Sequence, residues 1–320
     1  MSVTITASDI NKLRQATGAG MMDCRKALTE SGGDFDAAID WLRKQGQKVA
    51  AKRQDREAKE GAVIAKTTTG QTSGFVLCLA CETDFVAKNA EFVAFAQSLI
   101  DLAIAKDVKS LDELNAAPYE NLTVAEKINE QVAKIGEKVS ITRFERIDAP
   151  AVAAYIHGSN RMGVLVGLSK YSPAALEAGR DIAMQIAAMN PVAVDQESVP
   201  AEAIEREKAI ILDLIKQDPK MAGKPDEMLE KIAAGKLNSF FKESTLLAQA
   251  FVKDSNHSVA DYLKSVDAGL KVTAFQRVAL GEVYSIKYYT LIAGILNWMP
   301  AFLCPPRINS FLYLRSSFCT

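Results

Sequence analysis

The feature that most constrains this fold is a pattern of two strands and a helix that occurs twice in the middle of the chain. The first copy, residues 61–105, places a turn at Thr69–Gly70–Gln71 between two apolar runs and continues with helical spacing. The second copy, residues 152–189, repeats this order around Gly158–Ser159–Asn160. Short apolar runs joined by a tight turn are typical of antiparallel hairpins. The pattern predicts an α+β core of two similar halves, each an antiparallel sheet covered by helices.

Two segments lie between and beyond these copies. Thr123 and Glu126 have the spacing of a capping box, which predicts a helix ending near Ile135–Gly136, and residues 139–144 have the composition of one more strand. Residues 200–235 are charged and helical in pattern, with residues such as Met228 and Leu229 on the apolar side. They predict a helical hairpin inserted into the second half of the core.

The first 50 residues predict a compact unit of three short helices. Ser8 or Asp9 is a suitable cap for the first helix, Thr17–Gly18–Ala19–Gly20 ends it, and Asp34 caps the third. A unit of this size is typical of an interaction module. The basic residues that follow favour a solvated linker helix over an RNA contact, because acids interrupt them and no aromatic is interleaved for base stacking.

The sequence therefore divides into five segments. They are a three-helix interaction module at 1–50, a basic linker at 51–60, the first core half at 61–148, the second core half at 149–282 with the helical hairpin at about 200–235, and an atypical apolar tail at 283–320. The tail has no acid and holds eight of the chain's 23 aromatic residues. Its uncharged run from Tyr288 to Cys304 is short for a membrane span, which favours a divergent or out-of-frame continuation over a membrane anchor.

Composition argues against several kinds of site. A formal net charge of −1 does not favour a surface that follows nucleic-acid phosphate, and five cysteines with two histidines support neither a disulfide framework nor a zinc site. Cys78 and Cys81 have redox spacing, but on a strand they would point to opposite faces. The N-terminus lacks the features of a signal peptide, so we expect a reducing cytoplasm. We expect no metal, cofactor, catalytic residue or membrane contact.

The junction at residues 81–89 is the strongest candidate site. Asp84 and Phe85 follow a buried strand and precede a helix for which Asn89 is a suitable cap, so Phe85 is predicted to lie on neither element. An aromatic there either fills the core or projects outward as an interface residue, and the local residues alone favour the core. His157, before Gly158, has no partner pattern for catalysis and is predicted to be a turn histidine.

Several motifs in order resemble one bacterial family. LRQATGAGMMDCRKAL at residues 13–28, ETDFVA at 82–87, KIGE at 134–137 and the histidine–glycine pair at 157–158 closely resemble elongation factor Ts, over about Thr4 to Gly281. The resemblance implies a guanine nucleotide exchange factor of the GTPase elongation factor Tu, which loosens bound GDP without covalent chemistry. It also implies a ubiquitin-associated-like N-terminal module, a hairpin associated with dimerisation, and a short C-terminal helical module.

The resemblance also assigns partner contacts and reverses the expectation for Phe85. It implies that Asp84 and Phe85, flanked by Thr83 and Val86, contact the GTPase, with Phe85 near its magnesium and phosphate site. Further contacts implied on the same grounds are Ile135, Gly136 and His157, with Met21, Met22 and Asp23 as candidates in the N-terminal module. The family continues after Gly281–Glu282 with an acidic helix, whereas this chain does not. A protein- or RNA-binding module without exchange activity is the alternative.

Overall fold

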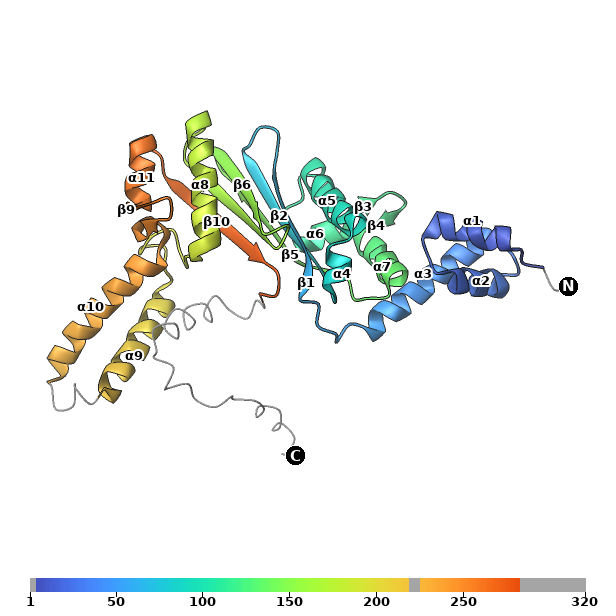
Figure 1. Cartoon of the computed structure of the whole chain (residues 1–320), viewed down its shortest axis with the longest axis horizontal. Coiled ribbons are helices and arrows are strands. Elements are labelled where there is room, and N and C mark those ends of the chain that lie inside the picture. Colours follow the sequence, from blue (N-terminus) through green and yellow to red (C-terminus); the bar gives the residue numbers. More distant parts are fainter. Residues whose placement is uncertain (1–3, 219–224, 283–320) are drawn as a thin grey trace, which may run out of the picture. The chain divides into compact units, whose positions relative to one another are not determined.

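The computed structural model describes residues 4–218 and 225–282, so the predictions made for the tail at 283–320 lie outside the described residues. Helices and antiparallel sheets are both present, which confirms the α+β class (Figure 1). Within the described ranges, no helix is both long and apolar enough to cross a membrane.

Three helices form the N-terminal unit: α1 (Ala7–Thr17), α2 (Met21–Glu30) and α3 (Phe35–Lys52). Thr6, and not Ser8 or Asp9, caps α1; its hydroxyl accepts from the Asp9 backbone N–H while the Asp9 carboxylate accepts from the Thr6 N–H. Asp34 caps α3 as predicted. Gly18 ends α1 in the left-handed region, with φ of 69°, where glycine is favoured.

The first core half is a three-stranded antiparallel sheet covered by helices. Its strands are β1 (Glu60–Thr67), β2 (Ser73–Cys81) and β5 (Ser140–Asp148), in the order β1-β2-β5. The other elements are α4 (Asp84–Ala87), α5 (Ala90–Ala105), α6 (Leu111–Ala116), the short pair β3 (Pro118–Tyr119) and β4 (Leu122–Thr123), and α7 (Val124–Ile135). Thr123 and Glu126 form the predicted capping box at the start of α7.

The second core half repeats this arrangement. Strands β6 (Ala151–His157), β7 (Met162–Leu168) and β10 (Val272–Ala279) pair in the order β10-β7-β6, and α8 (Pro173–Met189) packs on β6 and β7. The remaining elements are the 3-10 turn η2 (Leu246–Ala248), the short pair β8 (Ala250–Phe251) and β9 (Asp254–Ser258), and α11 (Val259–Val266). The antiparallel pairing of β6 with β7 confirms the predicted second hairpin.

Helices α9 (Ala201–Gln217) and α10 (Asp226–Ser244) pack on each other as the predicted helical hairpin, and α10 continues nine residues beyond the predicted end at 235. Buried Ile211 and Ile215 of α9 meet Leu229 and Ala233 of α10. Met228, expected on this apolar side, is 45% exposed instead.

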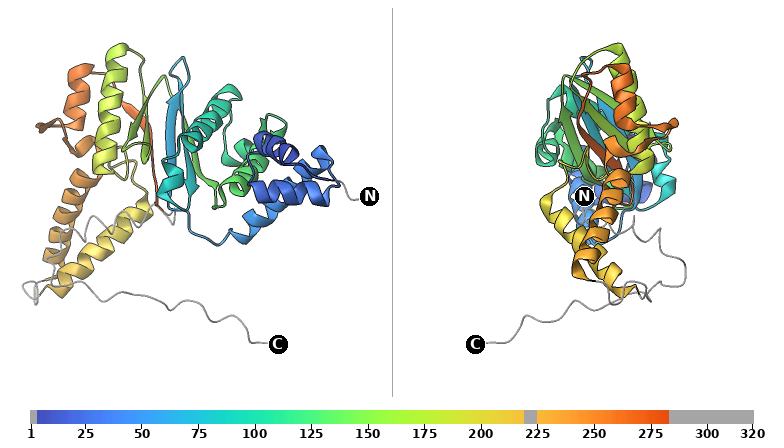
Figure 2. Two further views of the ribbon diagram at one scale, coloured as in Figure 1. Left: turned by 45° about the vertical axis from the view of Figure 1, so that its right-hand side comes forward. Right: turned by 90° about the vertical axis from the view of Figure 1, so that its left-hand side faces the viewer.

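The two sheets pack face to face. Val63 and Val76 of the first sheet meet Val152 and Leu165 of the second in one buried cluster. Helices α5 and α8 cover the outer faces, so the order of layers is helix, sheet, sheet, helix (Figure 2). Glycines allow the close approach: a Cβ built at Gly163 would lie 2.9 Å from the Val63 and Val76 methyl groups.

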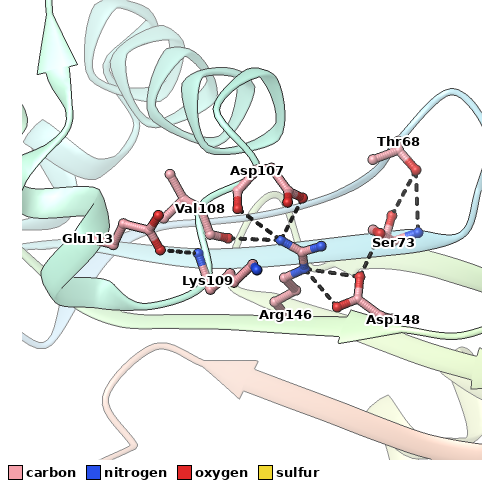
Figure 3. Close-up of polar contacts among 8 residues, drawn as sticks. All are labelled: Thr68, Ser73, Asp107, Val108, Lys109, Glu113, Arg146 and Asp148. Atoms are coloured by element: carbon pink, nitrogen blue, oxygen red, sulfur yellow. Dashed lines mark hydrogen bonds and ion pairs between the residues drawn. The ribbon is translucent and has the colours of Figure 1, made fainter.

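A polar cluster fastens the last strand of the first sheet to the loop after α5 (Figure 3). The Arg146 guanidinium lies between Asp107 at 2.7 Å and Asp148 at 2.9 Å, and it also donates to the Val108 carbonyl. It lies 5.1 Å from the centre of the Phe75 ring. Burial acts to raise the pKa of Asp148, but hydrogen bonds from Ser73 and Arg146 outweigh it and lower that pKa.

Candidate functional site

Phe85 lies on a single helical turn and points into solvent. The turn is α4, which is separated from the end of β2 only by Glu82 and Thr83. Phe85 is 84% exposed, while Val86 and Ala87 pack against the core of the first half. A single turn cannot bury both sides, so burying Val86 and Ala87 leaves the ring outside. The core position that the local residues favoured is therefore wrong, and so is the expectation that Phe85 belongs to no regular element.

Asp84 is the first residue of this turn and forms an ion pair with Lys88. Its carboxylate accepts a hydrogen bond from Lys88 Nζ at 2.6 Å, one turn later on the same surface. This hydrogen bond, together with the positive charge of Lys88, lowers the pKa of Asp84. Asp84 is thus a carboxylate at neutral pH, next to an exposed apolar ring.

Glu137 links the Phe85 turn to the end of α7. Its carboxylate accepts two hydrogen bonds from Thr83: one from the backbone N–H at 3.0 Å and one from the hydroxyl at 2.7 Å. Helix α7 is capped at its C-terminus by Gly136, whose φ of 78° lies in the left-handed region that favours glycine, and Ile135 is the half-buried last residue of the helix. The structure therefore places the Ile135–Gly136 turn beside Thr83.

Glu82 makes the complementary link. Its carboxylate accepts from the Lys138 N–H at 2.6 Å and forms ion pairs with Arg53 at 2.8 Å and Arg56 at 3.1 Å. Burial acts to raise the pKa of Glu82, but the Lys138 N–H and the two arginines outweigh it and lower that pKa. Two cations of the predicted solvated linker are thus engaged within the protein.

His157 is the last residue of β6, and the turn after it lies at the end of the sheets where β2 finishes. Its Nδ1 lies 3.0 Å from the Tyr155 hydroxyl, so it is a hydrogen-bonded surface histidine. In the turn that follows, Arg161 lies 3.2 Å from Glu60, the residue of β1 that pairs with Cys81 at the end of β2. Cys81 precedes the Phe85 turn by only a few residues, so the β6–β7 turn lies near the end of β2 from which that turn begins.

The N-terminal candidates are exposed and belong to a unit that packs on α7. Met21 and Met22, at the start of α2, are 52% and 73% exposed, and Asp23 beside them is also exposed. A Cβ built at Gly18 would lie 3.0 Å from Lys134 of α7. Helix α7 therefore supports the N-terminal unit and ends in the Ile135–Gly136 turn.

The two cysteines of β2 are buried in separate clusters. Cys78 and Cys81 belong to buried clusters on opposite faces of the sheet, as predicted. Burial, followed by the carboxylates of Glu137 and Glu60, raises the pKa of the Cys81 thiol to about 12. In residues 4–218 and 225–282 there is no group of three or more His, Cys, Asp or Glu placed to bind a metal ion.

Glu82 and Glu137 lie within the ETDFVA and KIGE motifs, but the sequence predicts no role for either. Each bonds a segment more than 50 residues away, and no local pattern reports such a pairing. The signal available was limited to an acid beside each motif. Their function as links became visible only from the fold.

Comparisons with known proteins agree with these motifs. The family profile described as Elongation factor TS matches residues 82–282. The chain is 51% identical over 277 residues to elongation factor Ts of Christiangramia forsetii, which covers 87% of this chain and 99% of that protein. It is 49% identical to that of Flavobacterium psychrophilum and 47% identical to that of Cytophaga hutchinsonii, with the same coverage of both chains. The chain belongs to the elongation factor Ts family, a family of translation elongation factors.

Proposed function

We propose that this chain is a guanine nucleotide exchange factor that binds the GDP-bound form of elongation factor Tu. It promotes GDP release by disturbing the magnesium and phosphate site of that GTPase. Membership of the elongation factor Ts family supports this function, as does the surface around Asp84 and Phe85. The mechanism uses no covalent step, and it operates in the cytoplasm with translation.

The observation that carries the proposal is the exposure of Phe85 on a short helix whose other side is packed. Burying a phenylalanine side chain yields about 1.5–3 kcal/mol, so a ring left 84% exposed is available for an interface. Rigid aromatics near the centre of a contact are typical interface hot spots. Asp84 beside it offers a carboxylate for polar contacts at the same point.

Magnitudes require a contact wider than this ring. A nucleotide held at a Kd of about 1 nM is bound by about 12 kcal/mol, several times what one phenylalanine supplies. We assign the remaining contacts to the Ile135–Gly136 turn, to His157, and to Met21, Met22 and Asp23 at the start of α2. Factor and GDP then weaken each other's binding by the same free energy, which is the thermodynamic condition for exchange.

Release of labelled GDP from elongation factor Tu tests the function. We expect the full chain to accelerate release, and Phe85→Ala to lose most of that acceleration while unfolding at nearly the same temperature. Tyr171→Ala is the matched control, since Tyr171 is another exposed aromatic that lies between β7 and α8. Unchanged release with Phe85→Ala would contradict the role of the ring. Tight binding without accelerated release would support a binding module that does not catalyse exchange.

We also propose that the α9–α10 hairpin forms a homodimer contact. Leu214 of α9 and Met228 of α10 are partly exposed on it, which supplies apolar surface beyond the buried contacts within the hairpin. Sedimentation equilibrium of the intact chain and of a Leu214→Glu, Met228→Glu variant tests this. A dimer that survives both changes would place the contact elsewhere.

A further inference from the structure

We propose that Glu82 and Glu137 are positioning residues that hold Phe85 in the orientation needed to act on the GTPase. This inference rests on the proposed exchange function. Neither carboxylate is assigned a contact with the partner. Each instead bonds a backbone N–H of the other's segment: Glu137 accepts from Thr83, and Glu82 accepts from Lys138.

The helical turn that carries Phe85 needs support from outside itself. Helix α4 has four residues, and a turn this short is unstable in isolation because nucleating a helix is costly. Thr83 precedes the turn but makes no capping bond to it with its side chain. The Thr83 hydroxyl instead donates to Glu137, so Thr83 is held by two bonds to one carboxylate.

Glu82, the residue just before Thr83, is held by three groups. Its side chain is only 15% exposed, and its two oxygens are shared among the Lys138 N–H, Arg53 and Arg56. Lys138 Nζ in turn donates to the carbonyls of Gln54 and Arg56. The linker, the end of β2 and the residues after α7 are therefore joined in one network of charge-assisted hydrogen bonds.

Glu82 is the charged centre of this network. Its carboxylate pairs with the guanidinium groups of Arg53 and Arg56 and accepts from the Lys138 backbone N–H. Partly buried ionic groups are tolerated when they are paired in this way, whereas removing one partner leaves the other charge desolvated and unpaired. The network fixes the Phe85 turn relative to the Ile135–Gly136 turn, so both enter a partner already oriented, which lowers the entropic cost of binding.

Glu137→Ala is the decisive variant because it removes both bonds to Thr83 and leaves the core side chains in place. We expect it to slow release of labelled GDP roughly tenfold, as the loss of two charge-assisted hydrogen bonds allows. Glu137→Gln keeps an acceptor for the Thr83 N–H and should lose less. Glu91→Ala is the control: it removes an exposed ion pair with Lys134 that also joins α7 to another helix, and release should be unchanged.

A double-mutant cycle separates positioning from a merely structural effect. If Glu137 acts through Phe85, then Glu137→Ala should slow release very little further in a Phe85→Ala background. Equal losses in both backgrounds would overturn the proposal. If Glu137→Ala unfolds, the same cycle is run with Glu137→Gln.

Hydrogen exchange gives a readout that does not depend on the GTPase. The backbone amides of Ala87, Lys88 and Asn89 donate within and just after α4, and they should exchange faster in Glu137→Ala while the amides of β2 remain protected. Unchanged exchange there would contradict the positioning role. If the unaltered chain did not accelerate GDP release from elongation factor Tu, the proposed function would be contradicted instead, so the two failures are distinguishable.

Discussion

Gly163 of β7 lies against Val63 of β1 with no room for a side chain: a Cβ at Gly163 would be 2.9 Å from Val63 Cγ1. This contact joins the two sheets that together carry the candidate site. We expect Gly163→Ala to lower the free energy of unfolding by about 1–3 kcal/mol, the usual cost of overpacking a core. Chemical denaturation measures the change.

Two companion variants sharpen that test. Gly70→Ala is the control, because its added methyl would meet only the Thr72 hydroxyl at 3.8 Å, and we expect a change within about 0.5 kcal/mol. Gly163→Ala should lower the free energy of unfolding by less in a Val63→Ala background than in the original chain, since Val63→Ala removes one of the methyl groups that the new side chain would meet. A Gly163→Ala protein as stable as the original would show that the sheets can separate at no cost.

The Arg146 cluster predicts a contrast between two kinds of ion pair. Arg146→Ala should cost about 1–3 kcal/mol of stability, because the guanidinium is largely buried and donates to several acceptors. Lys66→Ala removes the pair with Asp101, in which both side chains are about half exposed, and should cost less than about 1 kcal/mol. Denaturation of both variants compares them, and equal effects would mean that the burial of Arg146 contributes nothing.

Local signals predicted most of the secondary structure. The turns at residues 69–71 and 158–160 and the capping box of Thr123 depend on neighbours a few residues away, so the sequence contains them in full. Thr6 was missed as a cap because Ser8 and Asp9 are also suitable cap residues, and only the position of the first helical residue decides among them.

Non-local relationships could not be predicted in the same way. The bonds from Thr83 to Glu137 join residues 54 apart, and the outward orientation of Phe85 depends on which side of α4 the core covers. The residues around Phe85 favoured burial, whereas the family resemblance favoured exposure, and the fold agrees with the resemblance. Met228 shows the same limit, because helical spacing does not say where a two-helix contact ends.

The buried cysteines of β2 predict low thiol reactivity. Burial raises the pKa of Cys78 and raises that of Cys81 to about 12, so the reactive thiolate form is disfavoured in the folded protein. We expect both to resist alkylation in the folded protein and to react after unfolding, with no disulfide between them. Peptide mass spectrometry reads each cysteine separately. Rapid labelling of folded Cys81 would contradict its buried environment.

Glu207 predicts a pH-dependent stability of the helical hairpin. It is 1% exposed on the face of α9 that carries Ala203, Ile211 and Ile215, and its Oε2 has no hydrogen-bond partner among the described residues. Burial raises its pKa, against a weaker opposing effect of Arg206. At neutral pH the carboxylate therefore costs stability, and Glu207→Leu should stabilise the protein by about 1–3 kcal/mol.

The sign of the pH effect follows from the raised pKa of folded Glu207. As pH falls through that value, the folded protein takes up a proton before the unfolded chain does, so its free energy of unfolding rises. The advantage of Glu207→Leu should therefore shrink as the pH is lowered from neutral through the raised pKa of folded Glu207, as measured by denaturation followed by helical circular dichroism. Glu205→Leu, on the exposed side of α9, is the control and should show no such trend. A gap between Glu207→Leu and the unaltered chain that stays constant with pH would mean that Glu207 is solvated in the folded hairpin.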